Sequence, residues 1–184
     1  MKNRRLTRIG MGLALAIAPL VAVAQPAEAG ADKYFCAELG GIYRTFARTP
    51  RGNVPMISWV SNTNPEWPSR RRCIEVSKRF ERYYDNGMRY LGTGIVNNES
   101  VLCAVRQQGN ACNEDNLLVT LSPGMDRHQA AQRLLDMRGL AAGRTLELNG
   151  EQVARTVNGE IYYNIDQWLN QMPAEEATLT PEGE

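Results

Sequence analysis

From residue 33 onward the chain carries short runs of apolar, β-branched and aromatic residues, separated by glycine, proline and polar residues, which is typical of strands. These runs predict three strands, at residues 33–38, 42–48 and 54–60. Between the last two, Thr49–Asn53 (TPRGN) supplies the proline and glycine of a hairpin turn. This part of the chain is therefore expected to form antiparallel strand pairs.

Between Ser69 and Gly87 (SRRRCIEVSKRFERYYDNG) the pattern has a helical period. At about 100° per residue, one narrow stripe gathers the positions expected to be buried, which are Cys73, Val76, Ser77, Phe80 and Tyr84. Ser69 stands at the N-cap position, and Asn86-Gly87 supplies a left-handed stop. We therefore predict one long amphipathic helix.

Strand patterns return after this helix, and the predicted strands are residues 90–96, 100–106, 116–121, 146–148, 152–157 and 160–163. Tight turns are predicted at Asn97-Asn98 and at the Asn-Gly pairs 149–150 and 158–159, so the last three strands should form a small meander. A second helix is predicted over residues 127–138, behind the capping-box-like pair Asp126 and Gln129, and a short helix over residues 165–171. The predicted fold is a single α+β domain, in which an antiparallel sheet of hairpins packs with one long amphipathic helix and a second, shorter helix.

The N-terminus has the pattern of a secretory signal peptide. Four basic residues, Lys2, Arg4, Arg5 and Arg8, precede an apolar run over residues 9–24. An A-x-A site predicts cleavage after Ala24, and a second site offers cleavage after Ala29. The run is shorter than the ~20 residues of a membrane-spanning helix and contains a proline. We therefore expect export to the periplasm, the thylakoid lumen or the extracellular space.

Beyond residues 1–24, the chain divides into a domain at residues 31–172 and an acidic tail at residues 173–184. The full chain has 21 basic and 20 acidic residues, and loss of four basic residues with the signal leaves a net charge of −3. This balance gives no argument for binding nucleic acid, so only a local patch could attract an anion. The tail (PAEEATLTPEGE) has four glutamates and no aromatic residue, and it is expected to be disordered.

All four cysteines, Cys36, Cys73, Cys103 and Cys112, lie beyond the predicted cleavage sites. An even number in an exported chain predicts two disulfides, with three possible pairings. The Gly109-Asn110 turn favours Cys103–Cys112, which leaves Cys36–Cys73 to tie the first strand to the long helix. A zinc site is the rival interpretation, but paired C-x2-C elements are missing and the chain has one histidine, so we expect no metal.

The residues around the cysteines belong to longer, specific segments. These are YFC at 34–36, ARTPRGNVPMISWVS at 47–61, RRCIEVSKRFERYYDNGMRYLGTGIVN at 71–97, VLCAV at 101–105, Cys112, LLVTLSPG at 117–124 and YYNIDQWL at 162–169. In these segments the chain resembles the cyanobacterial circadian oscillating protein family of exported domains. The resemblance implies an extracytoplasmic protein, peripheral to a membrane, whose abundance follows a daily rhythm. It implies no reaction, and only the four cysteines carry over.

The exposed side of the long helix has an excess of positive charge. Its basic residues are Arg70, Arg71, Arg72, Lys78, Arg79 and Arg82. The first three stand at the positive end of the helix dipole, which is unfavourable unless an acidic group of the fold or an external anion lies nearby. Helix N–H groups and arginine side chains suit a phosphate, a sulfate or a lipid headgroup, so these six residues are candidate anion- or partner-binding residues. The alternative is a solvated face whose arginines pair with Glu66, Glu75 or Glu81.

No catalytic motif stands out, since the chain has no Gly-rich phosphate loop, no H-E-x-x-H and no G-x-S-x-G. The sole histidine, His128, is expected to face solvent at the start of the second helix. We predict no catalytic residue, no cofactor and a non-catalytic binding module, held at an anionic membrane surface or by an acidic protein partner. Two alternatives are a secreted hydrolase with paired carboxylates and an inhibitor-like subunit that presents the stapled 103–112 loop.

Overall fold

The computed structural model describes residues 31–60, 65–131, 153–175 and 178–183. The predicted signal peptide, the strand at 146–148 and the Asn-Gly turn at 149–150 lie outside these residues, as does most of the second predicted helix. The described residues from Asp32 onward belong to one compact unit, Asp32–Glu184.

The first sheet contains the three strands predicted near the N-terminus. β1 (Tyr34–Leu39), β2 (Ile42–Thr49) and β3 (Gly52–Trp59) pair antiparallel in the order β1-β2-β3. Gly40 and Gly41 join β1 to β2 at φ values of 62° and 76°, which residues with a side chain rarely adopt. The alternation of the strands puts one face of the sheet against the long helix and the other toward the acidic tail.

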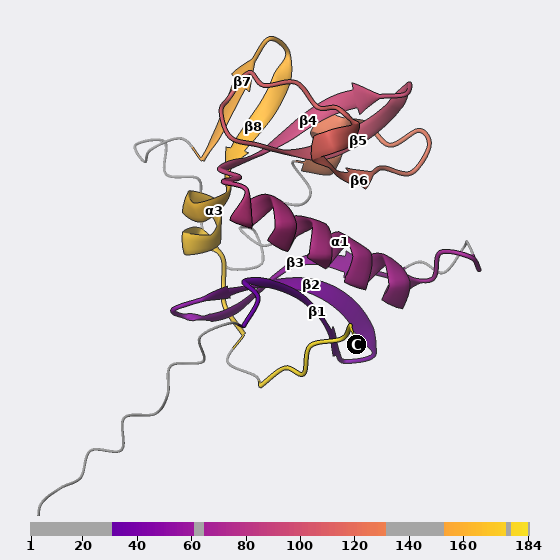
Figure 1. Ribbon diagram of the computed structural model, residues 1–184, viewed down its shortest axis with the longest axis vertical. Coiled ribbons are helices and arrows are strands. Elements are labelled where there is room, and N and C mark those ends of the chain that lie inside the picture. The colour runs from indigo at the N-terminus through magenta and orange to yellow at the C-terminus, as the bar shows by residue number, and fades with distance from the viewer. Residues whose placement is uncertain (1–30, 61–64, 132–152, 176–177, 184) are drawn as a thin grey trace, which may run out of the picture. The chain divides into compact units, whose positions relative to one another are not determined.

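The long helix, α1 (Ser69–Asp85), packs along one face of this sheet (Figure 1). Its buried residues are Ser69, Cys73, Val76, Ser77 and Phe80, which confirms most of the predicted stripe. Tyr84 is instead 37% exposed, because it lies in the last turn, where its ring meets Tyr34 edge-on and lies 4.1 Å from the Lys33 ammonium. The predicted N-cap is also corrected, since Pro68 holds that position and Ser69 is the first helical residue.

A second antiparallel sheet holds the remaining strands in the order β6-β5-β4-β8-β7. The strands are β4 (Tyr90–Val96), β5 (Glu99–Val105), β6 (Leu117–Thr120), β7 (Ala154–Val157) and β8 (Glu160–Asn164). Asn97, Asn98 and Asn158 have positive φ, as predicted for their turns. The sequence predicted one sheet, whereas the structure has two. β8 pairs with β7 across the predicted Asn158-Gly159 turn, and its other edge pairs with Tyr90–Gly92 of β4.

Helices connect the two sheets. Besides α1, which contacts β6, the short helix α3 (Ile165–Gln171) contacts both β2 and β8. Its Trp168 and Leu169 are buried in a core shared by residues of both sheets. The second predicted helix is described over residues 127–131, where Asp126 accepts a hydrogen bond from the Gln129 backbone at 2.8 Å. The prediction of an α+β fold is confirmed.

Both predicted disulfides are present, Cys36–Cys73 between β1 and α1 and Cys103–Cys112 beside β5. The Cα atoms of each pair are 5.5 Å apart, a usual separation for a disulfide. The two bridges fit a protein outside the reducing cytosol. Among the described residues, no helix has the length and apolar content needed to cross a membrane.

Gly94 in β4 lies directly against the Cys103–Cys112 bridge. A Cβ atom at this position would approach both Cβ and Sγ of Cys112 to 2.7 Å, and the disulfide prevents Cys112 from moving freely away. We expect Gly94→Ala to lower the free energy of unfolding by about 1.5 kcal/mol, measured by urea denaturation. In a protein that also carries Cys103→Ala and Cys112→Ala, Gly94→Ala should lower the free energy of unfolding clearly less. An equal loss in both proteins would contradict this explanation.

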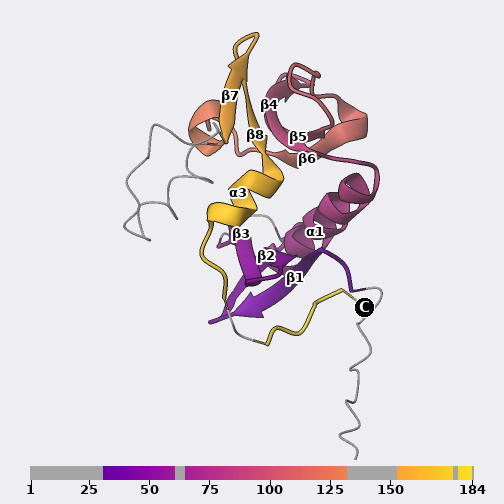
Figure 2. The same cartoon turned by 90° about the vertical axis from the view of Figure 1, so that its left-hand side faces the viewer.

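The acidic tail was expected to be disordered, but its described residues are docked on the first sheet. Asn53 and Glu175 exchange two backbone hydrogen bonds of 3.1 and 2.8 Å, and the Glu182 N–H donates to the Cys36 carbonyl at 2.7 Å. Between these points Leu179 packs against the apolar cluster of Phe35, Ala37 and Phe46. The tail thus crosses the face of the first sheet opposite α1 (Figure 2). Its polar composition did not reveal this docking, which uses one leucine, the backbone groups of two sheet edges and the ion pair of Glu182 with Arg70.

Candidate functional site

The solvent-facing stripe of α1 consists of the exposed Arg71, Lys78 and Arg82 and the half-buried Glu75, which follow one another at spacings of four, three and four residues. Such spacing places side chains on one side of a helix. Arg79 lies next to this stripe and is half-buried. We call Arg71, Lys78, Arg79 and Arg82 the basic face. Four cations against one carboxylate make it a positively charged surface.

Three of the six predicted binding residues lie at the start of α1, and each has a specific neighbour. Arg70 Nε is 2.7 Å from Glu182 Oε2 in the acidic tail. The guanidinium of Arg71 stacks 4.6 Å from the Trp67 ring, and that of Arg72 lies 5.4 Å from the Trp59 ring. Glu182 is thus the acidic group expected near the crowded positive charges of the helix N-terminus, and it is supplied by the tail. Glu81 was a suggested partner of these arginines but instead accepts backbone hydrogen bonds from Lys33 and Tyr34.

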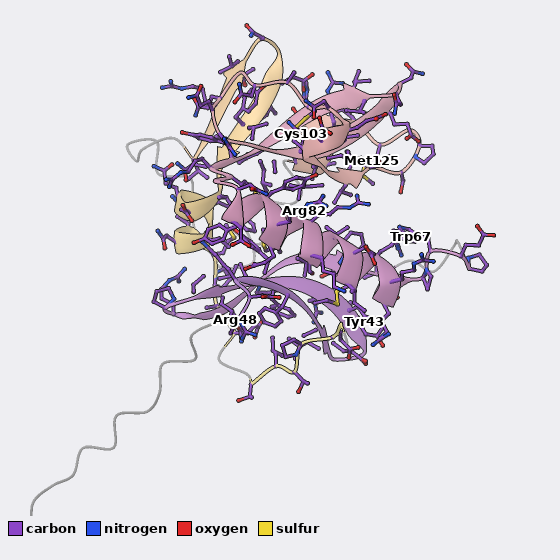
Figure 3. The ribbon with its side chains drawn as sticks, viewed as in Figure 1. Tyr43, Arg48, Trp67, Arg82, Cys103 and Met125 are labelled. Carbon is purple, nitrogen blue, oxygen red and sulfur yellow. A yellow bond between two sulfur atoms is a disulfide. The ribbon has the colours of Figure 1, made fainter. Side chains whose placement is uncertain are left out.

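The other three predicted residues, Lys78, Arg79 and Arg82, line a groove of about 520 Å³. The groove lies between α1 and the segment formed by β6 and the short 3-10 helix η1 (Glu114–Asn116). Its remaining lining residues are Glu75, Tyr83, Glu114 and Leu117. Figure 3 shows Arg82 on the side of α1 that faces the second sheet. The sequence predicted that these cations share one helix. It could not show that Glu114, from a distant segment, lines the same groove.

Contacts with β6 hold the two arginines of the groove in place. Arg79 Nη1 donates to the Leu118 carbonyl at 3.2 Å. Arg82 Nη2 donates to the Tyr83 hydroxyl at 3.2 Å, and that hydroxyl donates to the Leu117 carbonyl at 3.3 Å. Because these arginine side chains are already ordered, the protein loses less side-chain entropy when an anion binds them.

Glu114 is likewise oriented on the opposite side of the groove. Its Oε1 accepts a hydrogen bond of 2.7 Å from the Asn97 side chain, and Asn97 belongs to the turn between β4 and β5. The groove therefore presents three cations and the Glu75 carboxylate on its helical side and the oriented Glu114 carboxylate on the other. This arrangement suits a ligand that carries negative charge together with hydrogen-bond donors, such as hydroxyl groups.

A second polar cluster, which the sequence did not reveal, surrounds Glu160 at the start of β8. Arg127 makes a two-pronged contact with its carboxylate at 2.8 to 3.0 Å, Thr93 donates at 2.6 Å, and His128 Nε2 lies at 3.2 Å. Burial alone would raise the pKa of Glu160, but these hydrogen bonds outweigh it and lower the pKa to about 2. His128 therefore faces a carboxylate rather than solvent alone. Since the four residues come from three separate segments, no spacing along the sequence could have shown the cluster.

Glu160 is unsuited to the general-acid role of the hydrolase alternative. A general acid needs a pKa near the working pH, whereas the pKa of Glu160 lies far below neutrality. All four cysteines are in disulfides and cannot act as nucleophiles or metal ligands. Within the described ranges, no group of three or more acidic, histidine or cysteine side chains could hold a metal ion. The basic face and its groove are therefore the candidate site.

Comparison with known proteins gives a match to a protein family. The model of the family described as Circadian oscillating protein COP23 matches residues 33–170. This span includes both disulfides, the basic face and the groove, whereas the acidic tail lies beyond it. No curated protein and no solved structure matches the chain.

Proposed function

The chain belongs to the circadian oscillating protein COP23 family, and on the strength of its basic face we propose that it is an exported, non-catalytic binding module. It attaches peripherally to an anionic membrane surface. The predicted signal peptide and the two disulfides support a location in the periplasm, the thylakoid lumen or the extracellular space. The family description further supports an abundance that follows a daily rhythm.

The observation that carries this proposal is the exposed stripe on α1. Arg71, Lys78 and Arg82 extend over about three turns of one helix, a length of roughly 16 Å at 1.5 Å per residue. An array of this length suits a surface of many headgroups better than a single small anion. Trp67, stacked on Arg71, adds an aromatic ring of the kind enriched at membrane interfaces.

The test is sedimentation with vesicles that contain phosphatidylglycerol and phosphatidylcholine. Each basic residue near an anionic surface contributes about 1 kcal/mol. Replacement of Arg71, Lys78 and Arg82 by glutamine should therefore weaken binding about a hundredfold. Arg79 is kept, because its hydrogen bond to Leu118 supports the packing of α1 on β6. Binding of the unaltered protein should fall steeply with added salt, since the Debye length is about 8 Å at physiological ionic strength.

A matched control removes the same amount of charge elsewhere. Arg89, Arg106 and Arg155 are exposed and lie outside α1, so their replacement by glutamine should leave most of the binding intact. Pure phosphatidylcholine vesicles should not bind the unaltered protein. An equal loss of binding in both triple variants would contradict a role specific to the basic face, and no binding to anionic vesicles at low salt would exclude the membrane proposal.

A further inference from the structure

We propose that the acidic tail is a built-in competitor of the anionic ligand, and that it regulates access to the basic face by docking beside α1. The inference rests on the proposed function, because it concerns the regulation of the same surface. It is carried by the position of Glu182 and Gly183, which the tail's docking brings next to α1.

The end of the tail lies along α1 beside the basic face. Glu182 Oε2 is 2.7 Å from Arg70 Nε, at the first turn of the helix. One residue later, a Cβ atom built on Gly183 would lie 3.7 Å from Ile74 Cγ2 and 3.9 Å from Lys78 Cε. Arg70, Ile74 and Lys78 follow at intervals of four residues, so the tail runs beside one side of the helix. Lys78 belongs both to this side and to the groove.

The negative charge of Glu182 affects the pKa of a neighbouring side chain, Tyr43. Desolvation and the carboxylates of Glu38 and Glu182 raise the pKa of Tyr43, whereas Arg70 opposes this effect. Tyr43 is labelled near the end of the tail in Figure 3. A carboxylate that acts on its neighbours in this way also reduces the positive potential that an approaching anionic surface meets at Arg70 and Lys78.

The acidic tail is held by contacts that an anionic ligand can displace. The described tail is held by two isolated backbone bridges, by Ala174 at the main core, by Leu179 on the apolar face of the sheet, and by an ion pair whose Arg70 side chain is 50% exposed. Exposed ion pairs contribute little to stability and weaken with salt. An anionic surface that attracts Arg70 and Lys78 therefore competes directly with Glu182.

Competition of this type is reciprocal. If the docked tail weakens binding by some factor, the bound ligand must loosen the tail by the same factor. The competition is therefore visible in two independent measurements, the affinity for vesicles and the protection of the tail from hydrogen exchange. A tail that merely covered Phe35 and Phe46 would leave both unchanged by the charge of residue 182.

The first experiment compares Glu182→Gln with Glu99→Gln in the full chain, using the same phosphatidylglycerol vesicles. Glu99 is exposed at the start of β5 in the second sheet, so its replacement changes the net charge equally without touching the tail. Glu182→Gln is expected to bind about two- to fivefold more tightly than the unaltered protein, the range of an exposed ion pair. Glu99→Gln should bind like the unaltered protein.

The second experiment measures hydrogen exchange in a peptide that covers residues 173–183. Exchange should become faster when anionic vesicles are added and stay unchanged with neutral vesicles. Leu179→Ser should speed the exchange without vesicles and tighten vesicle binding, because it releases the same segment through its apolar contact.

The outcomes separate the two proposals. Equal binding by the unaltered protein and Glu182→Gln, with the tail equally protected on vesicles, overturns the competition but leaves the proposed function intact. Equal tightening by Glu182→Gln and Glu99→Gln also overturns it, because net charge alone then explains the effect. If none of the proteins binds anionic vesicles at low salt, both proposals fall.

Discussion

Replacement of both Cys36 and Cys73 by alanine is expected to lower the free energy of unfolding by about 4 kcal/mol. The bridge closes a loop with a sequence separation of 37 residues, and such a loop restricts the unfolded chain strongly. Both sulfur atoms also lie in the main core, where Cys36 is 1% and Cys73 0% exposed. The loss is large against the roughly 5–15 kcal/mol of a typical domain, and urea denaturation measures it.

The second disulfide provides the comparison. Cys103 and Cys112 are nine residues apart, so the same substitution there should cost only about 2.5 kcal/mol. The difference between the two variants tests the loop-length explanation without relying on either absolute value. A larger loss from the shorter loop would contradict it.

Replacement of Glu160 by glutamine should remove about 3 kcal/mol of stability at pH 7, by the relation of 1.36 kcal/mol per pKa unit. Hydrogen bonds from Arg127, Thr93 and His128 lower the pKa of Glu160 from 4.5 to about 2, although burial opposes them. Since the pKa is lower in the folded state, this contribution is fully present above pH 4.5. It is lost as the pH falls from about 4.5 to about 2.

Urea denaturation at a series of pH values checks this prediction. The unaltered protein should lose more stability between pH 5 and pH 2 than the Glu160→Gln variant, which lacks the titrating group. The exposed Glu99→Gln variant should behave like the unaltered protein over the same range. Parallel acid profiles for the Glu160→Gln variant and the unaltered protein would show that Glu160 does not carry this part of the stability.

The sequence predicted local structure well, because hydrophobic period and turn residues act over short distances. Residues 90–96 and 165–171 were predicted with the bounds that the structure gives to β4 and α3. Asn97, Asn98 and Asn158 revealed their turns because few other residues tolerate positive φ. The disulfide pairing also came from a local feature, the turn between Cys103 and Cys112.

Long-range pairing could not be predicted in the same way. The pattern of residues 160–163 fits any antiparallel neighbour, and nothing in it specifies β4 as the partner. The acidic tail was misjudged because composition measures only the average tendency of a segment. Leu179 above Phe35 and Phe46, backbone bridges at both ends and the ion pair of Glu182 with Arg70 dock it.

In the candidate site, too, local features could be predicted and long-range contacts could not. The helical period placed Arg71, Lys78 and Arg82 on one exposed stripe, and the structure agrees. The period could not show that Arg70 meets Glu182, or that Glu114 closes the groove opposite Arg82. These neighbours lie far away in the sequence and come together only through the packing of α1 between the two sheets.

β1 forms an outer edge of the first sheet, and the described residues add only the bridge at Glu182 to that edge. Exposed backbone along a sheet edge attracts strands from other molecules and can start polymerisation. Proline at 181 and the glycine at 183, on either side of the bridging residue, are poor strand formers. The bridge at Glu182 thus covers part of the β1 edge with residues that are poorly suited to pair with a further strand.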